Sequence, residues 1–228
     1  MSGQRKYLER ATANYSKQLQ ALRPGTDDVG VIEYLRQHAI TYAISEKYRL
    51  GYVGTPLAGD EQFTGALAIP YLSRAGVVSI KFRLLTGDAK FLYHEGTKGR
   101  LYNTEAYFKT DNVIGITEGE IDAIVATEVV GLPSIGVPGA TTWNAMSDIW
   151  GPVFSDNYEH VIIFADGDPV NELTGLRAGA EFAKDVRRTL GWRAQIVWCP
   201  EGEDVSSMVF SGRADELKER VRKLESEL

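Results

Sequence analysis

The chain has 228 residues, of which 43% are hydrophobic and 25% charged, and its net charge is −6. These values are ordinary for a folded globular protein and fit one large domain or two small ones. The one cysteine, Cys199, excludes an internal disulfide and a cysteine-rich zinc site within this sequence. The apolar runs are only strand-sized, so we expect no signal peptide, no membrane partner and a reducing, cytoplasmic setting.

The charge is divided unevenly along the chain. Residues 1–110 hold 15 Lys and Arg against 10 Asp and Glu, whereas residues 111–228 hold 10 against 21. A basic half joined to an acidic half indicates separate tasks. The first half could grip a polyanion while the second holds metal ions.

The N-terminal half predicts two helices followed by short strands. Residues 5–22 form a polar helical stretch that Pro24 and Gly25 end. Asp27 or Asp28 could cap a second helix. Its apolar positions at helical spacing are Val31, Ile32, Leu35 and Ala39. Strands separated by glycine-containing turns are expected at residues 48–53, 66–71, 77–83 and 90–93. We therefore expect a small, basic, mixed α+β domain over residues 1–110.

From residue 112 the pattern becomes a strict alternation of strands and helices. The expected strands lie near residues 112–117, 133–137, 160–165 and 194–199. The expected helices lie near residues 119–130, 141–150 and 174–190. This alternation with short connections predicts an α/β fold with a Rossmann-like parallel sheet over residues 111–210. Residues 211–228 add a C-terminal helix with one apolar stripe.

Acidic residues follow three of the four predicted parallel strands. Their positions are Glu118, Glu120 and Asp122, then Asp166 and Asp168, then Glu201, Glu203 and Asp204. Ligands bind at the carboxyl ends of the strands in such sheets, and carboxylates gathered there repel one another unless cations lie between them. The sequence therefore predicts a Mg²⁺ site for phosphate chemistry, in which Mn²⁺ can replace Mg²⁺. Taken alone, the first cluster could equally be acids favoured by a helix dipole, and the second could be a turn.

A glutamate after the first strand and an Asp-x-Asp after the third resemble the signature of the Toprim domain. Glu118-Gly119 with Asp122, followed by Asp166-Gly167-Asp168, is most similar to the bacterial and phage DnaG-type primases. Further motifs of that family resemble the stretches at residues 68–71, 76–83, 90–93 and 98–102. The resemblance implies a Toprim-type fold with a primase RNA polymerase core.

The resemblance also implies roles for individual residues. Glu118, Asp166 and Asp168 would be catalytic, and together with Asp122 and Asp204 they would bind the metal. Arg83, Lys90 and Lys98 would hold the template or the incoming nucleotide. Arg100 joins them because residues 74–109 interleave Lys and Arg with aromatic residues, a composition that suits a single strand. The strand aromatics themselves fit a buried core face better.

Two departures from the family matter. Ser206 stands where a further aspartate is often found, which weakens the third metal-binding element, and residues 169–175 read as a short insertion. With one cysteine, a zinc-binding module is not expected in this chain.

The implied partners are a single-stranded DNA template, ribonucleoside triphosphates, and a replicative helicase or separate zinc-binding primase module. The implied function is synthesis of RNA primers by Mg²⁺-dependent nucleotidyl transfer. The alternatives are a Toprim-type nuclease and a non-catalytic module that binds single-stranded nucleic acid.

Overall fold

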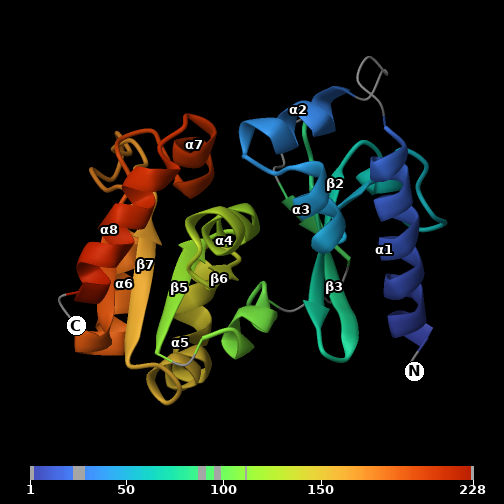
Figure 1. Cartoon of the computed structure of the whole chain (residues 1–228). Coiled ribbons are helices and arrows are strands. Elements are labelled where there is room, and N and C mark those ends of the chain that lie inside the picture. The colour runs from blue at the N-terminus through green and yellow to red at the C-terminus, as the bar shows by residue number, and fades with distance from the viewer. Residues whose placement is uncertain (1–2, 23–28, 87–90, 95–98, 111, 227–228) are drawn as a thin grey trace. The chain divides into compact units, whose positions relative to one another are not determined.

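The computed structural model describes residues 3–22, 29–86, 91–94, 99–110 and 112–226. The chain divides into two compact units, Met1–Lys98 and Gly99–Leu228 (Figure 1). The division falls before residue 110, because residues 99–110 belong to the second unit. Tyr102 forms a β-bridge with Gly136 there, and its amide donates to the Gly136 carbonyl at 2.8 Å. The C-terminal helix also belongs to the second unit.

The first unit begins with three helices: α1 (Gly3–Ala21), α2 (Val29–Gln37) and α3 (Tyr42–Lys47). The helix expected at residues 5–22 is confirmed by α1. Ala39 does not continue the second helix, because it follows the end of α2 with a φ of 55°. Asp27 and Asp28, the expected caps, lie outside the described residues. Thr41 caps α3 by accepting a hydrogen bond from the Ile44 amide.

The strands of the first unit form an antiparallel sheet in the order β1 (Gly51–Tyr52), β2 (Leu67–Ser73), β3 (Gly76–Arg83) and β4 (Phe91–Tyr93). The expected strand at residues 48–53 is wrong for its first half, since Tyr48 ends α3 and Arg49 has a φ of 53°. Helix α1 packs on this sheet and completes the core. Buried there are Leu8, Ala11, Tyr15, Val77, Ile80 and Phe82.

The second unit contains a parallel sheet in the order β6 (Ser134–Val137), β5 (Val113–Glu118), β7 (His160–Ala165) and β8 (Ala194–Trp198). All four strands lie within two residues of their predicted positions. The α/β fold with a Rossmann-like parallel sheet and a smaller α+β region before it is therefore confirmed. Strands this fully buried are continuous apolar runs, which is why the sequence located them well.

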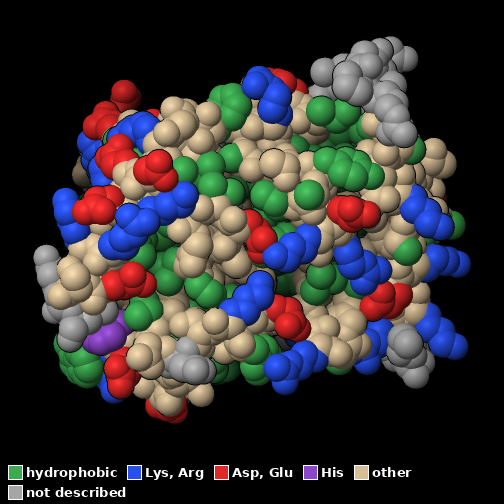
Figure 2. Space-filling view, viewed as in Figure 1, with side chains coloured by type: hydrophobic (Ala, Val, Ile, Leu, Met, Phe, Trp, Pro, Cys, Tyr) green, Lys and Arg blue, Asp and Glu red, His purple; other side chains and the backbone are tan. Residues whose placement is uncertain are grey.

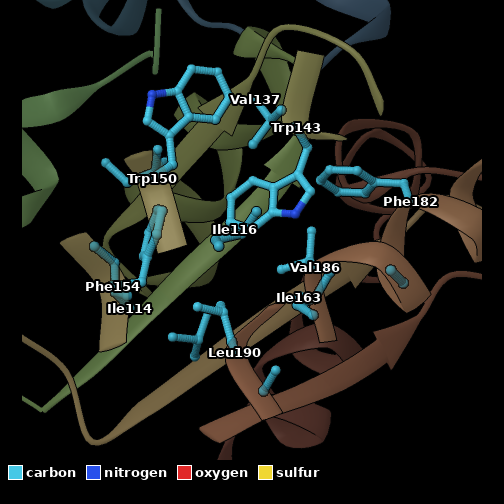
Figure 3. Packing of buried hydrophobic residues seen from close by; sticks show 14 of the residues in the cluster. Ile114, Ile116, Val137, Trp143, Trp150, Phe154, Ile163, Phe182, Val186 and Leu190 are labelled. Carbon is cyan, nitrogen blue, oxygen red and sulfur yellow. The ribbon is translucent and has the colours of Figure 1, made fainter. Parts of the chain in front are cut away.

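Helices cover both faces of the parallel sheet. Helices α5 (Ala140–Ser155) and α6 (Ala178–Leu190) cover one face, where Trp143, Phe182 and Val186 pack on Ile116 and Ile163 (Figure 3). The other face carries α4 (Glu120–Val125), α7 (Val205–Phe210) and α8 (Ala214–Ser226), which contact one another and the adjoining strands (Figure 1). Helix α6 begins later than the predicted residue 174, and α7 was not predicted. Among the described residues, no helix is long and apolar enough to cross a membrane.

Candidate active site

The first strand-end acid lies where β5 turns into α4. Glu118 is the last residue of β5, and Gly119 follows with a φ of 124°, a conformation that favours glycine. The Gly119 carbonyl accepts a hydrogen bond from Thr117 Oγ1 at 3.0 Å. On the neighbouring strand β6, a Cβ at Gly136 would lie 2.5 Å from that carbonyl. Two glycines thus allow the sharp turn that places Glu118 at the carboxyl edge of the sheet.

Asp122 and Asp204 are joined by Ser206. The buried Asp122 on α4 accepts a hydrogen bond at Oδ1 from the Ser206 amide, at 2.8 Å. Asp204 caps α7, and its Oδ1 accepts from the Ser207 amide at 2.7 Å and from Ser206 Oγ at 2.9 Å. Ser206 is fully buried. Ser206 therefore holds both carboxylates, Asp122 through its backbone amide and Asp204 through its hydroxyl.

Asp166 follows β7 and lies at the centre of the acidic group. Its Oδ1 is buried and has no hydrogen-bond partner among the described residues. Burial, followed by the negative charges of Asp122, Asp204, Glu118 and Asp168, raises the pKa of Asp166 to about 10. Burial and the Asp204 charge also raise the pKa of Asp122 to about 7, against the opposing hydrogen bonds from Ser206. The acids that follow β5, β7 and β8 therefore share one electrostatic environment.

Asp168 is held by the start of α6. Its Oδ2 accepts a hydrogen bond from the Gly179 amide at 2.8 Å, and its backbone carbonyl accepts from Arg177 Nη1 at 2.8 Å. The same guanidinium pairs with Glu201 through Nη2 at 2.7 Å. Arg177 thereby links the loop after β7 to the loop after β8, a role that its sequence position did not indicate.

Gly167 lies against the loop that follows β8. A Cβ at Gly167 would lie 1.7 Å from the Pro200 carbonyl oxygen. The Gly167 amide donates to the Glu203 carbonyl at 2.8 Å, and its carbonyl accepts from the Gly202 amide at 2.6 Å. The glycine is needed because the loop after β8 packs directly on it.

The carboxylates suit a hard cation, although they do not form a closed cage. Within the described residues, no group of three or more His, Cys, Asp or Glu side chains is already arranged to hold a metal ion. Mg²⁺ is commonly bound by one or two carboxylates, with water and substrate phosphates as its other ligands. An all-oxygen donor set and the buried Asp166 Oδ1 without a partner fit that kind of open site.

A second group of predicted residues lies on the antiparallel sheet of the first unit. Arg83 ends β3, and its guanidinium lies 4.7 Å from the Phe91 ring centroid and 5.1 Å from that of Tyr34. Its buried Nε has no hydrogen-bond partner in the described part of the chain. Lys81, which was not predicted, places Nζ 4.0 Å from the Phe91 centroid and 5.7 Å from that of Tyr93. These residues form a strip of cations and aromatic rings along β3 and the edge strand β4.

The structure adds little about the other basic residues that were predicted to bind nucleic acid. Lys90 and Lys98 lie outside the described residues, and Arg100 is exposed in the second unit. Of the aromatic side chains in residues 74–109, Phe82 and Tyr102 are buried, as the core interpretation predicted, whereas Phe91, Tyr93 and Phe108 are exposed. On the face shown in Figure 2, Lys and Arg are interspersed with Asp and Glu.

Comparison with known proteins identifies the class of fold. No family model matches the chain. The Aquifex aeolicus primase fragment with zinc-binding and RNA polymerase domains is similar with a TM-score of 0.71 and 20% identity, over 95% of this chain and 59% of that one. The RNA polymerase domain of Mycobacterium tuberculosis DnaG is similar with a TM-score of 0.65 and 18% identity, over 96% and 83%. The chain thus has the fold of the DnaG primase catalytic core.

The comparison of sequences gives a more specific result than the comparison of folds. The Gene 57 protein of Mycobacterium phage D29 is 42% identical over 168 residues, which are 70% of this chain and 99% of that protein. The chain belongs to the family of this phage protein.

Proposed function

We propose that the chain is the catalytic core of a DNA primase, which copies single-stranded DNA into short RNA primers by Mg²⁺-dependent nucleotidyl transfer. The observation that carries this proposal is the meeting of Glu118, Asp122, Asp166 and Asp204 at one edge of a parallel sheet with the DnaG-core fold. A fold can serve several functions, so the acidic site is the stronger part of the support.

The metal would be held by carboxylates whose arrangement the surrounding backbone fixes. We assign Glu118, Asp166 and Asp168 as catalytic ligands, supported by Asp122 and Asp204. Bound Mg²⁺, or Mn²⁺ in its place, would lower the pKa of the primer 3′-hydroxyl and offset charge on the phosphates. The hydrogen bonds from Ser206 and Gly179 hold three of these aspartates before substrate arrives, which reduces the reorganisation needed for catalysis.

The strip along β3 and β4 would hold the template strand. Arg83 supplies charge for phosphates, while the exposed rings of Phe91 and Tyr93 offer surfaces on which bases can stack. Lys81 is buried, with Nζ 4.0 Å from the Phe91 ring centroid, and supports that ring. We assign Lys90, Lys98 and Arg100 to the same task. One similar structure, at 16% identity, is a DnaG catalytic domain bound to single-stranded DNA, and another contains the primase fragment of the bacteriophage T7 primase-helicase. A helicase or a zinc-binding module is accordingly a candidate partner.

The test is incorporation of labelled ribonucleotides on single-stranded DNA, with and without a supplied primer. Asp166→Asn should abolish Mg²⁺-dependent incorporation. Asp148→Asn, the same chemical change at an exposed position on α5, is the matched control and should leave it unchanged. Cleavage of the DNA without incorporation would support the nuclease alternative. Binding without any metal-dependent reaction would support the non-catalytic alternative.

A further inference from the structure

The first unit contains a buried carboxylate that the acidic site does not use. Asp60 is fully buried, directly before the short turn Glu61–Phe63. Its Oδ2 accepts a hydrogen bond from the Tyr15 hydroxyl at 2.5 Å, and its Oδ1 lies 2.9 Å from Nε2 of His94. A carboxylate only accepts hydrogen bonds, so Nε2 of His94 carries a proton and donates it. Both oxygens of the buried carboxylate therefore have a donor, as a buried charge requires.

The carboxylate joins a helix to the end of a strand. Burial, followed by a hydrogen bond to Asp60, raises the pKa of Tyr7 and the pKa of Tyr15 above the ordinary value, so both hydroxyls keep their protons and can donate. Both tyrosines belong to α1, whereas His94 directly follows the edge strand β4. Asp60 is thus the point at which α1 and the end of β4 meet.

The imidazole of His94 is enclosed by aromatic rings. The ring centroids of Phe63 and Phe82 each lie 5.2 Å from that of the imidazole, and the centroid of Tyr7 lies 5.7 Å away, all in edge-to-face geometry. The His94 side chain is only 22% exposed. These ring contacts and the hydrogen bond to Asp60 leave the imidazole little freedom to move. His94 therefore fixes the backbone beside it.

The strand before His94 carries the rings that we assigned to the template. Strand β4 has three residues, Phe91–Tyr93, and pairs with β3 alone among the described strands. Side chains alternate between the two faces of a strand. Leu92 packs on the core, so Phe91 and Tyr93 lie on the opposite face. A three-residue strand with one neighbour has few contacts of its own to keep it in place.

Resting on the function proposed above, we propose that His94 is a positioning residue for the template strand. By binding Asp60 on the core side of the sheet, it holds β4 so that Phe91 and Tyr93 stay aligned for stacking on bases. The Cα of Tyr93 is one step of about 3.8 Å from that of His94, so a shift of the imidazole is passed directly to the ring. Stacking depends on close contact, and a gap of about 1 Å already loses a large part of it.

The experiment uses the whole chain and a single-stranded oligonucleotide that contains 2-aminopurine, a base whose fluorescence is quenched when it stacks. His94→Leu fills similar space without a donor and should weaken binding about tenfold, the loss of stacking on one base. At saturating protein, its complex should also be less quenched than the wild-type complex. Saturation removes the effect of affinity, so this second reading reports only how the bases stack.

Two amide variants test the hydrogen bond itself. His94→Gln places an amide donor near the position of Nε2 and should restore both affinity and quenching. His94→Asn carries the same amide on a side chain one carbon shorter, which does not reach Asp60, so it should behave like His94→Leu. This pair keeps the comparison possible with polar side chains if His94→Leu does not fold.

Tyr15→Phe is the matched control, because it removes a donor from the same carboxylate on the side of α1. Like His94→Leu, it should lower the Tm, but it should change neither DNA affinity nor quenching at a temperature where circular dichroism shows both variants to be folded. Wild-type affinity and quenching in His94→Leu and His94→Asn, failure of His94→Gln to restore them, or equal losses in Tyr15→Phe would each overturn the proposal.

A double variant, Phe91→Ala with Tyr93→Ala, separates this proposal from the function on which it rests. Because His94 acts through these rings, adding His94→Leu to the double variant should weaken binding no further, and a full additional tenfold loss would contradict the positioning role. Wild-type binding by the double variant would refute the assignment of the strip to the template. A chain that shows all the expected effects on DNA but incorporates no ribonucleotide would refute the polymerase function alone.

Discussion

Replacing Asp166 by asparagine should stabilise the metal-free protein while removing its activity. Asp166 lies among four other carboxylates, and its buried Oδ1 has no hydrogen-bond partner in the described part of the chain. Its pKa rises from 3.8 to about 10 in the folded chain, so folding at neutral pH forces a proton onto it or buries an unfavourable charge. Asparagine has nearly the same shape as aspartate, and it needs no proton and buries no charge.

The size and sign of the effect follow from proton linkage. An acid with a raised folded pKa loses no stability below pH 4, and the loss grows as pH rises from 4 towards 10. Each pH unit above 4 costs about 1.4 kcal/mol, which sets a ceiling of about 4 kcal/mol at pH 7. Water penetration and relaxation in a half-buried site reduce this, and we expect about 1–2 kcal/mol. For a chain of this length that corresponds to about 2–8 °C in Tm.

The assay is thermal unfolding of wild type and Asp166→Asn in EDTA between pH 5 and 8, repeated with Mg²⁺. The advantage of the variant should grow with pH in EDTA. Added Mg²⁺ should raise the Tm of wild type more than that of the variant, because binding to the folded state alone stabilises it. Asp148→Asn should show neither effect. An Asp166→Asn variant that is less stable than wild type at pH 8 in EDTA would refute the reasoning.

Three further outcomes are expected. Ser206→Ala removes the hydroxyl that donates to Asp204 and should cost about 1–2 kcal/mol in urea unfolding, with lower incorporation. Gly167→Ala should cost roughly 3 kcal/mol or more, because its Cβ would collide with the Pro200 carbonyl, and soluble protein of wild-type stability would contradict the packing described. Arg83→Ala should weaken single-stranded DNA binding regardless of sequence and reduce the slope of log K against log salt by about 0.7, as measured by titration at several salt concentrations.

The sequence located the elements best where burial alone determines them. The strands β5 and β7 are buried on both faces, and their continuous apolar runs are hard to mistake. The region around Tyr48 was harder, because aromatic and β-branched residues favour a strand while the Thr41 cap starts a helix that continues to Lys47. Residues 174–177 were expected to be helical, but the side chain of Asn171 organises them into a turn. In both cases hydrogen bonds from one polar side chain determine the local backbone, although the surrounding residues favour a strand or a helix.

For the candidate site, the sequence could predict the strand-end acids but not the residues that hold them. The strand-end positions of Glu118, Asp166 and Asp168 follow from the alternation of strands and helices. The link from Ser206 to Asp122 joins residues from different helices, α7 and α4, and depends on how those helices pack. One local signal was available, since an aspartate followed by serine three residues later is compatible with a cap at the start of α7.

The serine at position 206 also changes what the third acidic cluster can contribute. An aspartate there would add a buried charge beside Asp122 and Asp204, whose carboxylates already raise the pKa of Asp166. Serine donates its hydroxyl to Asp204 and its amide to Asp122, so one oxygen of each carboxylate is engaged in holding the site together. We propose that metal binding then depends mainly on Asp166, whose Oδ1 has no hydrogen-bond partner among the described residues, together with Glu118 and Asp168. A site with few protein ligands must take the rest from water and substrate phosphates, so metal binding in this chain should strengthen when nucleotide binds.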